Sequence, residues 1–320
     1  MLRDTLIRFG ESEAARLLVT RSPLRALSRR FVPGERIEDL MRSIQQAQAD
    51  GMTSTCNYLG EAVQEAAQAS RAAGVYVRVL ERMHKQRIKG NVSLKLTQLG
   101  EGVSDKCLGE NLTRVLHTAG SVGAFVRLDM ESSAHTRRTL DALERLWARG
   151  YRNIGVALQA YLRRTPGDVE RMIQLGARVR LCKGAYAEPE SVALQERDEI
   201  RQSFSKLTRR LLSEGHYPAI ATHDEAMVDV TLDHASRESI PPDAFEFQML
   251  HGVRRDLQHE LVADGWRVRV YVPFGEHWYP YLMRRLAERP SNLLFFAGSL
   301  ARESLLGFRR GDRRSRRQGR

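Results

Sequence analysis

Short apolar runs alternate with longer amphipathic segments along most of the chain. In the longer segments apolar residues recur at a spacing near 3.6, as in Thr136–Arg149, with leucines at positions 140, 143 and 146, and in Ser191–Glu214. This spacing predicts helices. The short runs are rich in β-branched residues, as strands are, and we expect eight strands: Met52–Asn57, Asn91–Leu96, Phe125–Met130, Asn153–Gln159, Arg178–Lys183, Ala219–His223, Phe245–Met249 and Arg267–Val272.

Strict alternation of strands and helices predicts a parallel sheet, because a parallel neighbour needs a crossover connection. Eight repeats favour a (β/α)8 barrel over an open sheet, which usually has fewer strands. Helix-start residues stand where this fold needs them, at Ser132 or Ser133, at Thr165-Pro166 and at Asp224. We expect a catalytic barrel over residues 51–308, preceded by an N-terminal helical extension over 1–50 that is broken at Ser22-Pro23 and Pro33-Gly34.

Composition indicates a globular protein of a reducing compartment. Hydrophobic residues make up 42% and charged residues 28% of the 320 positions, enough for a sizeable core. No run approaches ~18 apolar residues, and charges interrupt the first twenty positions, so we expect neither a membrane span nor a secretion signal. The three cysteines, Cys56, Cys107 and Cys182, are far apart and form no metal or redox pair. We therefore expect a cytoplasmic protein.

The net charge of +12 is concentrated at the C-terminus. Residues 309–320 hold seven Arg and one Asp, which is half of the excess, and we expect a disordered basic tail there. The remaining charge is spread thinly, without a zinc-finger spacing or a basic helix interleaved with aromatics, so nucleic-acid binding is not the expected function. Such a tail would also suit an anionic membrane surface.

Polar residues stand at the ends of most predicted strands, where (β/α)8 barrels place their active sites. Any one of them could be a helix cap or a satisfied buried polar group, but their convergence on one mouth indicates a binding site. They are Lys95, Asp129, Gln159, Arg180, Lys183, Thr222, His223, Gln248 and Tyr271.

The residue types in this group exclude several chemistries. One His and one Asp are too few for a metal site, and a single carboxylate is too few for glycoside hydrolysis. Cys182 has no evident base, whereas a Schiff base on Lys95 or Lys183 stays open. Cations and amides favour an anionic ligand and a phosphate-bearing cofactor. Neither a G-x-G-x-x-G nor a Walker A motif is present, so a dinucleotide would not bind through a Rossmann loop.

Eight segments, in order over most of the barrel, match motifs of a known family. They are Val92–Leu96, Arg127–Glu131, Leu158–Tyr161, Val179–Tyr186, Ala221–His223, Phe245–Gly252, Arg269–Gly275 and Tyr281–Glu288. With these motifs the chain resembles the proline dehydrogenases, in particular the short monofunctional bacterial type. The first strand is the poorest match, and no residue role is inferred from it.

The resemblance implies a distorted (β/α)8 barrel with FAD across the strand ends and a substrate pocket closed by the eighth barrel helix. It implies oxidation of L-proline to 1-pyrroline-5-carboxylate by hydride transfer to flavin N5, the first step of proline catabolism. The implied catalytic residues are Asp129 and Arg180. The implied substrate residues are Lys95, Leu181, Leu250, Tyr271, Arg284 and Arg285, and the implied FAD residues are Met130, Gln159, Lys183, Gly184, Ala185, Thr222 and His223.

The resemblance also implies partners beyond L-proline. These are a quinone electron acceptor, peripheral contact with the inner face of the cell membrane, and functional coupling to a pyrroline-5-carboxylate dehydrogenase; no metal is expected. Three alternatives stay open: a hydroxyproline dehydrogenase, an aldolase-like Schiff-base barrel and a non-enzymatic anion-binding barrel. A flavin absorption spectrum that bleaches with substrate separates the last two from a proline dehydrogenase.

Overall fold

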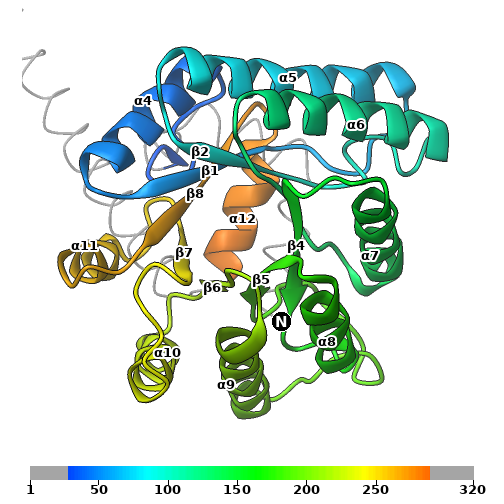
Figure 1. Ribbon diagram of the computed structural model, residues 1–320. Helices are drawn as coiled ribbons and strands as arrows, with labels where there is room; N and C mark the ends of the chain where they lie inside the picture. The colour runs from blue at the N-terminus through cyan, green and yellow to red at the C-terminus, as the bar shows by residue number, and fades with distance from the viewer. Residues whose placement is uncertain (1–27, 289–320) are drawn as a thin grey trace, which may run out of the picture.

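Eight parallel strands close into a barrel with helices around it (Figure 1). The computed structural model describes residues 28–288, apart from the side chains of residues 284 and 286–288. Each strand pairs with its neighbours in sequence, and β8 returns to β1, so no strand edge is left open. The strands are β1 (Thr53–Tyr58), β2 (Gly90–Leu94), β3 (Val126–Leu128), β4 (Ile154–Gln159), β5 (Arg178–Cys182), β6 (Ala219–Ala221), β7 (Glu246–Leu250) and β8 (Val268–Phe274).

A helix follows each strand, and among residues 28–52 one further helix precedes the barrel. They are α4 (Ile37–Ala49), α5 (Ala66–Lys85), α6 (Asp105–Ser121), α7 (Ser133–Ala148), α8 (Thr165–Leu175), α9 (Arg197–Glu214), α10 (Glu225–Arg237), α11 (Arg255–Ala263) and α12 (Trp278–Glu288). This order confirms the (β/α)8 prediction. The predicted starts are confirmed too: Ser132 and Asp224 are the N-caps of α7 and α10, and Pro166 lies in the first turn of α8.

The predicted elements differ from the observed ones mainly at their ends, where hydrogen bonds within turns compete with the backbone hydrogen bonds between strands. β6 ends at Ala221 because Thr222 already belongs to the next turn, its hydroxyl accepting a hydrogen bond from the backbone of Asp224. β8 extends to Phe274, which pairs with Tyr58 of β1. The helix expected from Ser191 begins only at Arg197.

The main apolar core lies between the barrel and the helices. In α4, for example, Leu40, Met41, Ile44 and Ala47 are buried at helical spacing, and the helix packs against β1 and β8. Residues 1–27 of the expected N-terminal extension and the basic tail over 309–320 lie outside the described residues. Between residues 28 and 288, no helix combines the length and the apolarity that a membrane crossing requires.

Candidate active site

Arg180 is the centre of the polar cluster at the C-terminal mouth of the barrel. Its side chain comes from β5 and is only 7% exposed. Its Nη1 donates to Asp129 Oδ1 at 2.5 Å, its Nη2 to Ser93 Oγ at 2.7 Å and its Nε to Gln248 Oε1 at 2.5 Å. All three nitrogens of the guanidinium are therefore used, and residues of β2 and β7 and the residue after β3 fix its orientation.

Tyr271 completes the contacts of Asp129. Its hydroxyl donates to Asp129 Oδ2 at 2.6 Å, and its ring lies 5.2 Å from the guanidinium carbon of Arg180. Burial raises the pKa of Tyr271 well above its usual value, and the negative charge of Asp129 adds to this effect. Tyr271 is thus a neutral hydrogen-bond donor, and both oxygens of Asp129 are occupied.

A second hydrogen-bonded layer lies beneath Arg180, and the roles of its members were not predicted from the sequence. Gln248 Nε2 donates to Glu246 Oε1 at 2.5 Å, and Arg269 binds both oxygens of Glu246 at 2.8 and 2.9 Å. Burial alone would raise the pKa of Glu246, but Arg269 outweighs it and holds the pKa below its usual value. The only sequence feature that links these residues is the two-residue spacing of Glu246 and Gln248 on β7, which places them on one strand face.

Lys95 has an ion-pair partner outside the cluster around Arg180. Its Nζ forms an ion pair with Glu61 Oε1 at 2.9 Å, and Glu61 lies in the loop that follows β1. Nearby, the buried carboxylate of Glu131 accepts hydrogen bonds from the backbone and hydroxyl of Thr97. Burial raises the pKa of Glu131 in spite of these bonds. No periodicity indicates Glu61, because loop residues follow none.

Several predicted cofactor residues meet at the ends of β5 and β6, which are neighbouring strands. Lys183 Nζ forms an ion pair with Asp224 Oδ2 at 2.6 Å. Partial burial would raise the pKa of Asp224, but Lys183 and Arg201 outweigh it and lower the pKa. Gly184 has a φ of +117°, and a Cβ there would lie 2.1 Å from the ring of Tyr161, so only glycine fits.

The other predicted cofactor and wall residues have structural contacts of their own. His223 Nε2 accepts a hydrogen bond from the backbone of Leu250 at 2.8 Å, which joins the ends of β6 and β7. Gln159 Nε2 donates to the carbonyl of Glu131 at 2.8 Å. Leu181 and Met130 are buried in the main apolar cluster, whereas Ala185 is exposed. Ligand contacts for these residues stay predictions.

Helix α12 lies near the centre of the ring of strands in Figure 1. Its residues Trp278 and Leu282 form one apolar cluster with Leu59, which follows β1, and with Val253, which follows β7. These loops leave the C-terminal ends of their strands, so α12 borders the mouth. The guanidinium of Arg285 lies 5.3 Å from the ring centroid of Tyr281, and the side chain of Arg284 is outside the described residues.

The donors at this mouth fit a flavin dinucleotide. Lys183 and the hydroxyl of Thr222 are suited to a pyrophosphate. Arg180 supplies a buried positive charge where the strand ends converge. Within residues 28–288 no three His, Cys, Asp or Glu side chains gather as a metal site would need.

Sequence comparisons find relatives over most of the chain. A family model described as proline dehydrogenase matches residues 40–297. Proline dehydrogenase 2 of Bacillus subtilis strain 168 is 38% identical over 271 residues, which cover 85% of this chain and 89% of that protein. Proline dehydrogenase of Deinococcus radiodurans is 38% identical over 275 residues, covering 84% of this chain and 88% of the other.

A solved structure shares the fold. Proline utilization A (PutA) from Bdellovibrio bacteriovorus, inactivated by N-propargylglycine, superimposes with a TM-score of 0.76 and 26% identity over 82% of this chain. The matched part is 32% of that larger chain, so the chain described here spans about a third of the PutA protein.

Proposed function

Because this chain belongs to the proline dehydrogenase family, we propose that it uses FAD to oxidise L-proline to 1-pyrroline-5-carboxylate, the first step of proline catabolism. The observation that supports this most directly is the buried cluster of Arg180, Asp129 and Tyr271 at the strand ends. A fixed cation with a neutral donor beside it is suited to an anionic substrate and to a cofactor that gains negative charge.

Lys95, Arg284 and Arg285 are the proposed ligands of the proline carboxylate. A guanidinium can bind a carboxylate through two parallel hydrogen bonds, which orients the ring as well as holding it. Leu181, Leu250 and Tyr271 are proposed to wall the apolar part of the ring. This arrangement would exclude water from the carbon that is oxidised.

FAD, when bound, supplies the hydride acceptor. Arg180 is proposed to stabilise the negative charge that the reduced cofactor gains, and Asp129 to keep Arg180 in place. The remaining proposed cofactor contacts are Met130, Gln159, Lys183, Gly184, Ala185, Thr222 and His223. Lys183 and the Thr222 hydroxyl suit phosphate oxygens, because charge-assisted hydrogen bonds to such groups are the strong ones.

A quinone is the proposed electron acceptor, reached by peripheral contact with the inner face of the cell membrane. The product would pass to a pyrroline-5-carboxylate dehydrogenase. The PutA relatives are named bifunctional proteins, which supports coupling of two activities in that setting. This chain would provide only the first of them.

The test is the absorption spectrum of the purified protein after saturation with FAD. We expect a flavin spectrum that L-proline bleaches without an electron acceptor, and turnover when an artificial acceptor is added. Arg180→Ala should lose cofactor affinity or kcat. A protein that stays colourless with excess FAD and is inert towards proline would refute the proposal, and bleaching by hydroxyproline in preference to proline would reassign the substrate.

A further inference from the structure

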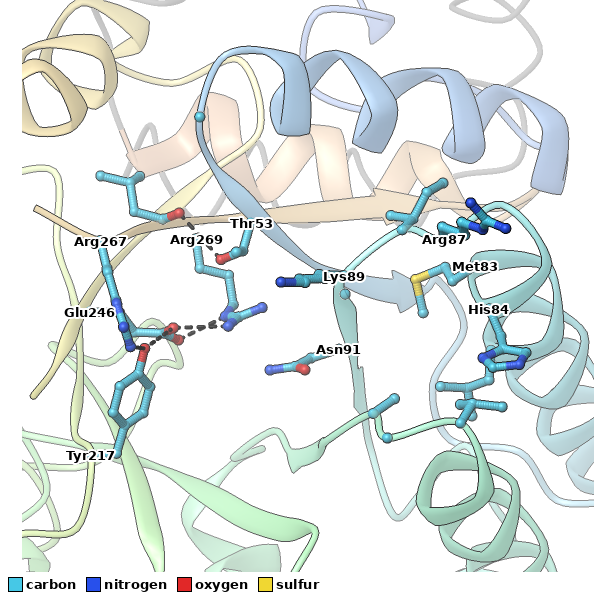
Figure 2. A pocket seen from close by; sticks show the side chains of 18 residues that line it. Thr53, Met83, His84, Arg87, Lys89, Asn91, Tyr217, Glu246, Arg267 and Arg269 are labelled. Carbon is cyan, nitrogen blue, oxygen red and sulfur yellow. Dashed lines mark hydrogen bonds and ion pairs between the residues drawn. The ribbon is translucent and has the colours of Figure 1, made fainter. Parts of the chain in front are cut away.

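A second concave site lies at the N-terminal end of the barrel, opposite the mouth that holds Arg180. It is a pocket of about 750 Å³, within the range of small-molecule sites. The beginnings of β1, β2, β7 and β8 and the C-terminal end of α5 surround it. Figure 2 shows side chains from these elements around one open space. The proposed proline chemistry uses none of the residues that line it.

The charges that line this pocket are mostly positive. Its basic residues are Arg87, Lys89, Arg267 and Arg269, whereas Glu246 is the single carboxylate among the 18 lining residues. Arg269 binds both oxygens of Glu246, and Gln248 and the hydroxyl of Tyr217 donate to them as well. The negative charge of Glu246 is therefore already matched by Arg269, and Arg267 forms an ion pair with Asp243 at 3.7 Å. Arg87 and Lys89 have no carboxylate partner between residues 28 and 288.

Lys89 and Asn91 are the donors best placed to bind a ligand. Asn91 is the second residue of β2, and Lys89, whose side chain is exposed, directly precedes the strand; both line the pocket. In Figure 2 both side chains point across the open space towards the side that holds Arg269. Between residues 28 and 288, neither side chain has a hydrogen-bond or ion-pair partner, although both border a defined pocket.

The interior of the barrel near this pocket also has an excess of positive charge. The side chain of Arg127 is only 3% exposed, and its Nη1 donates to the backbone carbonyls of Arg178 and Val156, not to a carboxylate. Burial, together with repulsion from Arg180 and Arg269, lowers the pKa of Arg127 to about 9 in spite of the opposing charge of Glu246. Buried charges are usually paired, so an anion nearby would relieve this repulsion.

We propose that the pocket at the N-terminal end of the barrel binds a multiply charged small oxyanion, with Lys89 and Asn91 as donors. Phosphate and carboxylate oxygens share the chemistry that these donors recognise. The volume admits a metabolite larger than a single phosphate. The apolar residues Leu80, Met83 and Ile88 on the α5 side would limit water access to the bound anion. This site is separate from the proline site and does not depend on the proposed reaction.

The test is isothermal titration calorimetry at low ionic strength on the FAD-saturated protein, with inorganic pyrophosphate and with citrate as separate probes. We expect saturable binding of at least one probe. Pyrophosphate alone would identify a phosphate-bearing ligand, citrate alone a polycarboxylate, and both a general oxyanion site. Lys89→Glu should weaken binding at least about 10-fold, because it replaces a charge-assisted contact with repulsion.

Two charge reversals of the same type serve as controls. Lys206→Glu changes an exposed lysine on α9 that is not among the pocket residues, and should change affinity by less than about twofold. Lys183→Glu changes the mouth and should leave binding at the opposite end intact. The proposal fails if neither probe binds saturably, if Lys206→Glu weakens binding as much as Lys89→Glu does, or if Lys183→Glu abolishes binding while Lys89→Glu does not.

Discussion

Tyr271→Phe tests the geometry of the proposed catalytic cluster with the smallest change. It removes the hydroxyl that donates to Asp129 Oδ2 at 2.6 Å. It keeps the ring, whose centroid lies 5.2 Å from the guanidinium carbon of Arg180. The expected effect is therefore that of one hydrogen bond to a charged acceptor.

The magnitude follows from the negative charge that the Asp129 carboxylate carries as acceptor. A hydrogen bond to a charged group contributes about 1.5–3 kcal/mol, against about 0.5–1.5 for a neutral pair. Tyr271→Phe should lower the free energy of unfolding by the larger amount in the native background. In an Asp129→Asn background Tyr271→Phe should lower the free energy of unfolding only by the neutral-pair value of about 0.5–1.5 kcal/mol. The double-mutant cycle should then give a coupling energy of about 1 kcal/mol or more.

The assay is reversible urea unfolding at one fixed FAD concentration, because the cofactor stabilises the folded state by mass action. Tyr151→Phe is the matched control: Tyr151 is also half-buried, the guanidinium of Arg149 lies 5.7 Å from its ring, and no described residue bonds its hydroxyl. It should change stability by less than about 0.5 kcal/mol. The assigned hydrogen bond is wrong if Tyr271→Phe changes the free energy of unfolding no more than Tyr151→Phe does. It is also wrong if Tyr271→Phe lowers that free energy equally with Asp and with Asn at position 129.

Three further predictions concern pH, substrate affinity and selectivity. Burial lowers the pKa of His251 from 6.5 to about 4, and the charge of Arg255 adds to this effect. The unfolded chain therefore binds a proton at His251 more readily than the folded protein does. The free energy of unfolding should be unaffected by this residue above about pH 6.5 and should fall by up to about 3 kcal/mol as the pH falls to 4. His251→Asn should flatten that part of the stability profile measured by urea unfolding, and an unchanged slope would contradict the assignment. Arg285→Ala should raise the KM for proline about 10–150-fold in steady-state assays, and an unchanged KM would remove Arg285 from the substrate site. The protein should prefer L-proline over 4-hydroxyproline, because a crowded pocket wall discriminates by about 1–3 kcal/mol. Tyr271→Ser should bring the kcat/KM values for the two substrates closer together. Equal kcat/KM values in the unmodified protein would contradict the predicted preference.

The barrel could be predicted from the sequence because its evidence is local. Each buried strand is a short apolar run, and each helix repeats apolar residues on one face, as Leu140 and Leu143 do in α7. Element ends were less predictable, because they depend on turn hydrogen bonds such as the one that Thr222 accepts. The strand-end rule then placed Asp129, Arg180 and Tyr271 at one mouth, where the structure has them in contact.

Contacts between distant residues could not be predicted in the same way. The ion pair of Lys95 with Glu61 joins a strand end to a loop, and loop conformation depends on the whole fold. The chain from Gln248 to Glu246 and Arg269 depends on how two strands align side by side, which the two-residue period of each strand does not fix. The pocket at the N-terminal end of the barrel could not be predicted either, because the strand-end rule points to the opposite end of the barrel.

The inside of this barrel explains why both of its ends suit anions. Barrel interiors are usually filled by branched apolar side chains. Here a hydrogen-bonded chain runs from Asp129 through Arg180, Gln248 and Glu246 to Arg269, from the mouth to the N-terminal pocket. A polar network of this kind must be fully bonded to be stable, and when it is, it holds its members rigidly. The chain therefore orients Arg180 at the mouth. Its terminal cation, Arg269, also borders the N-terminal pocket, so one interior network positions a basic side chain at each end of the barrel.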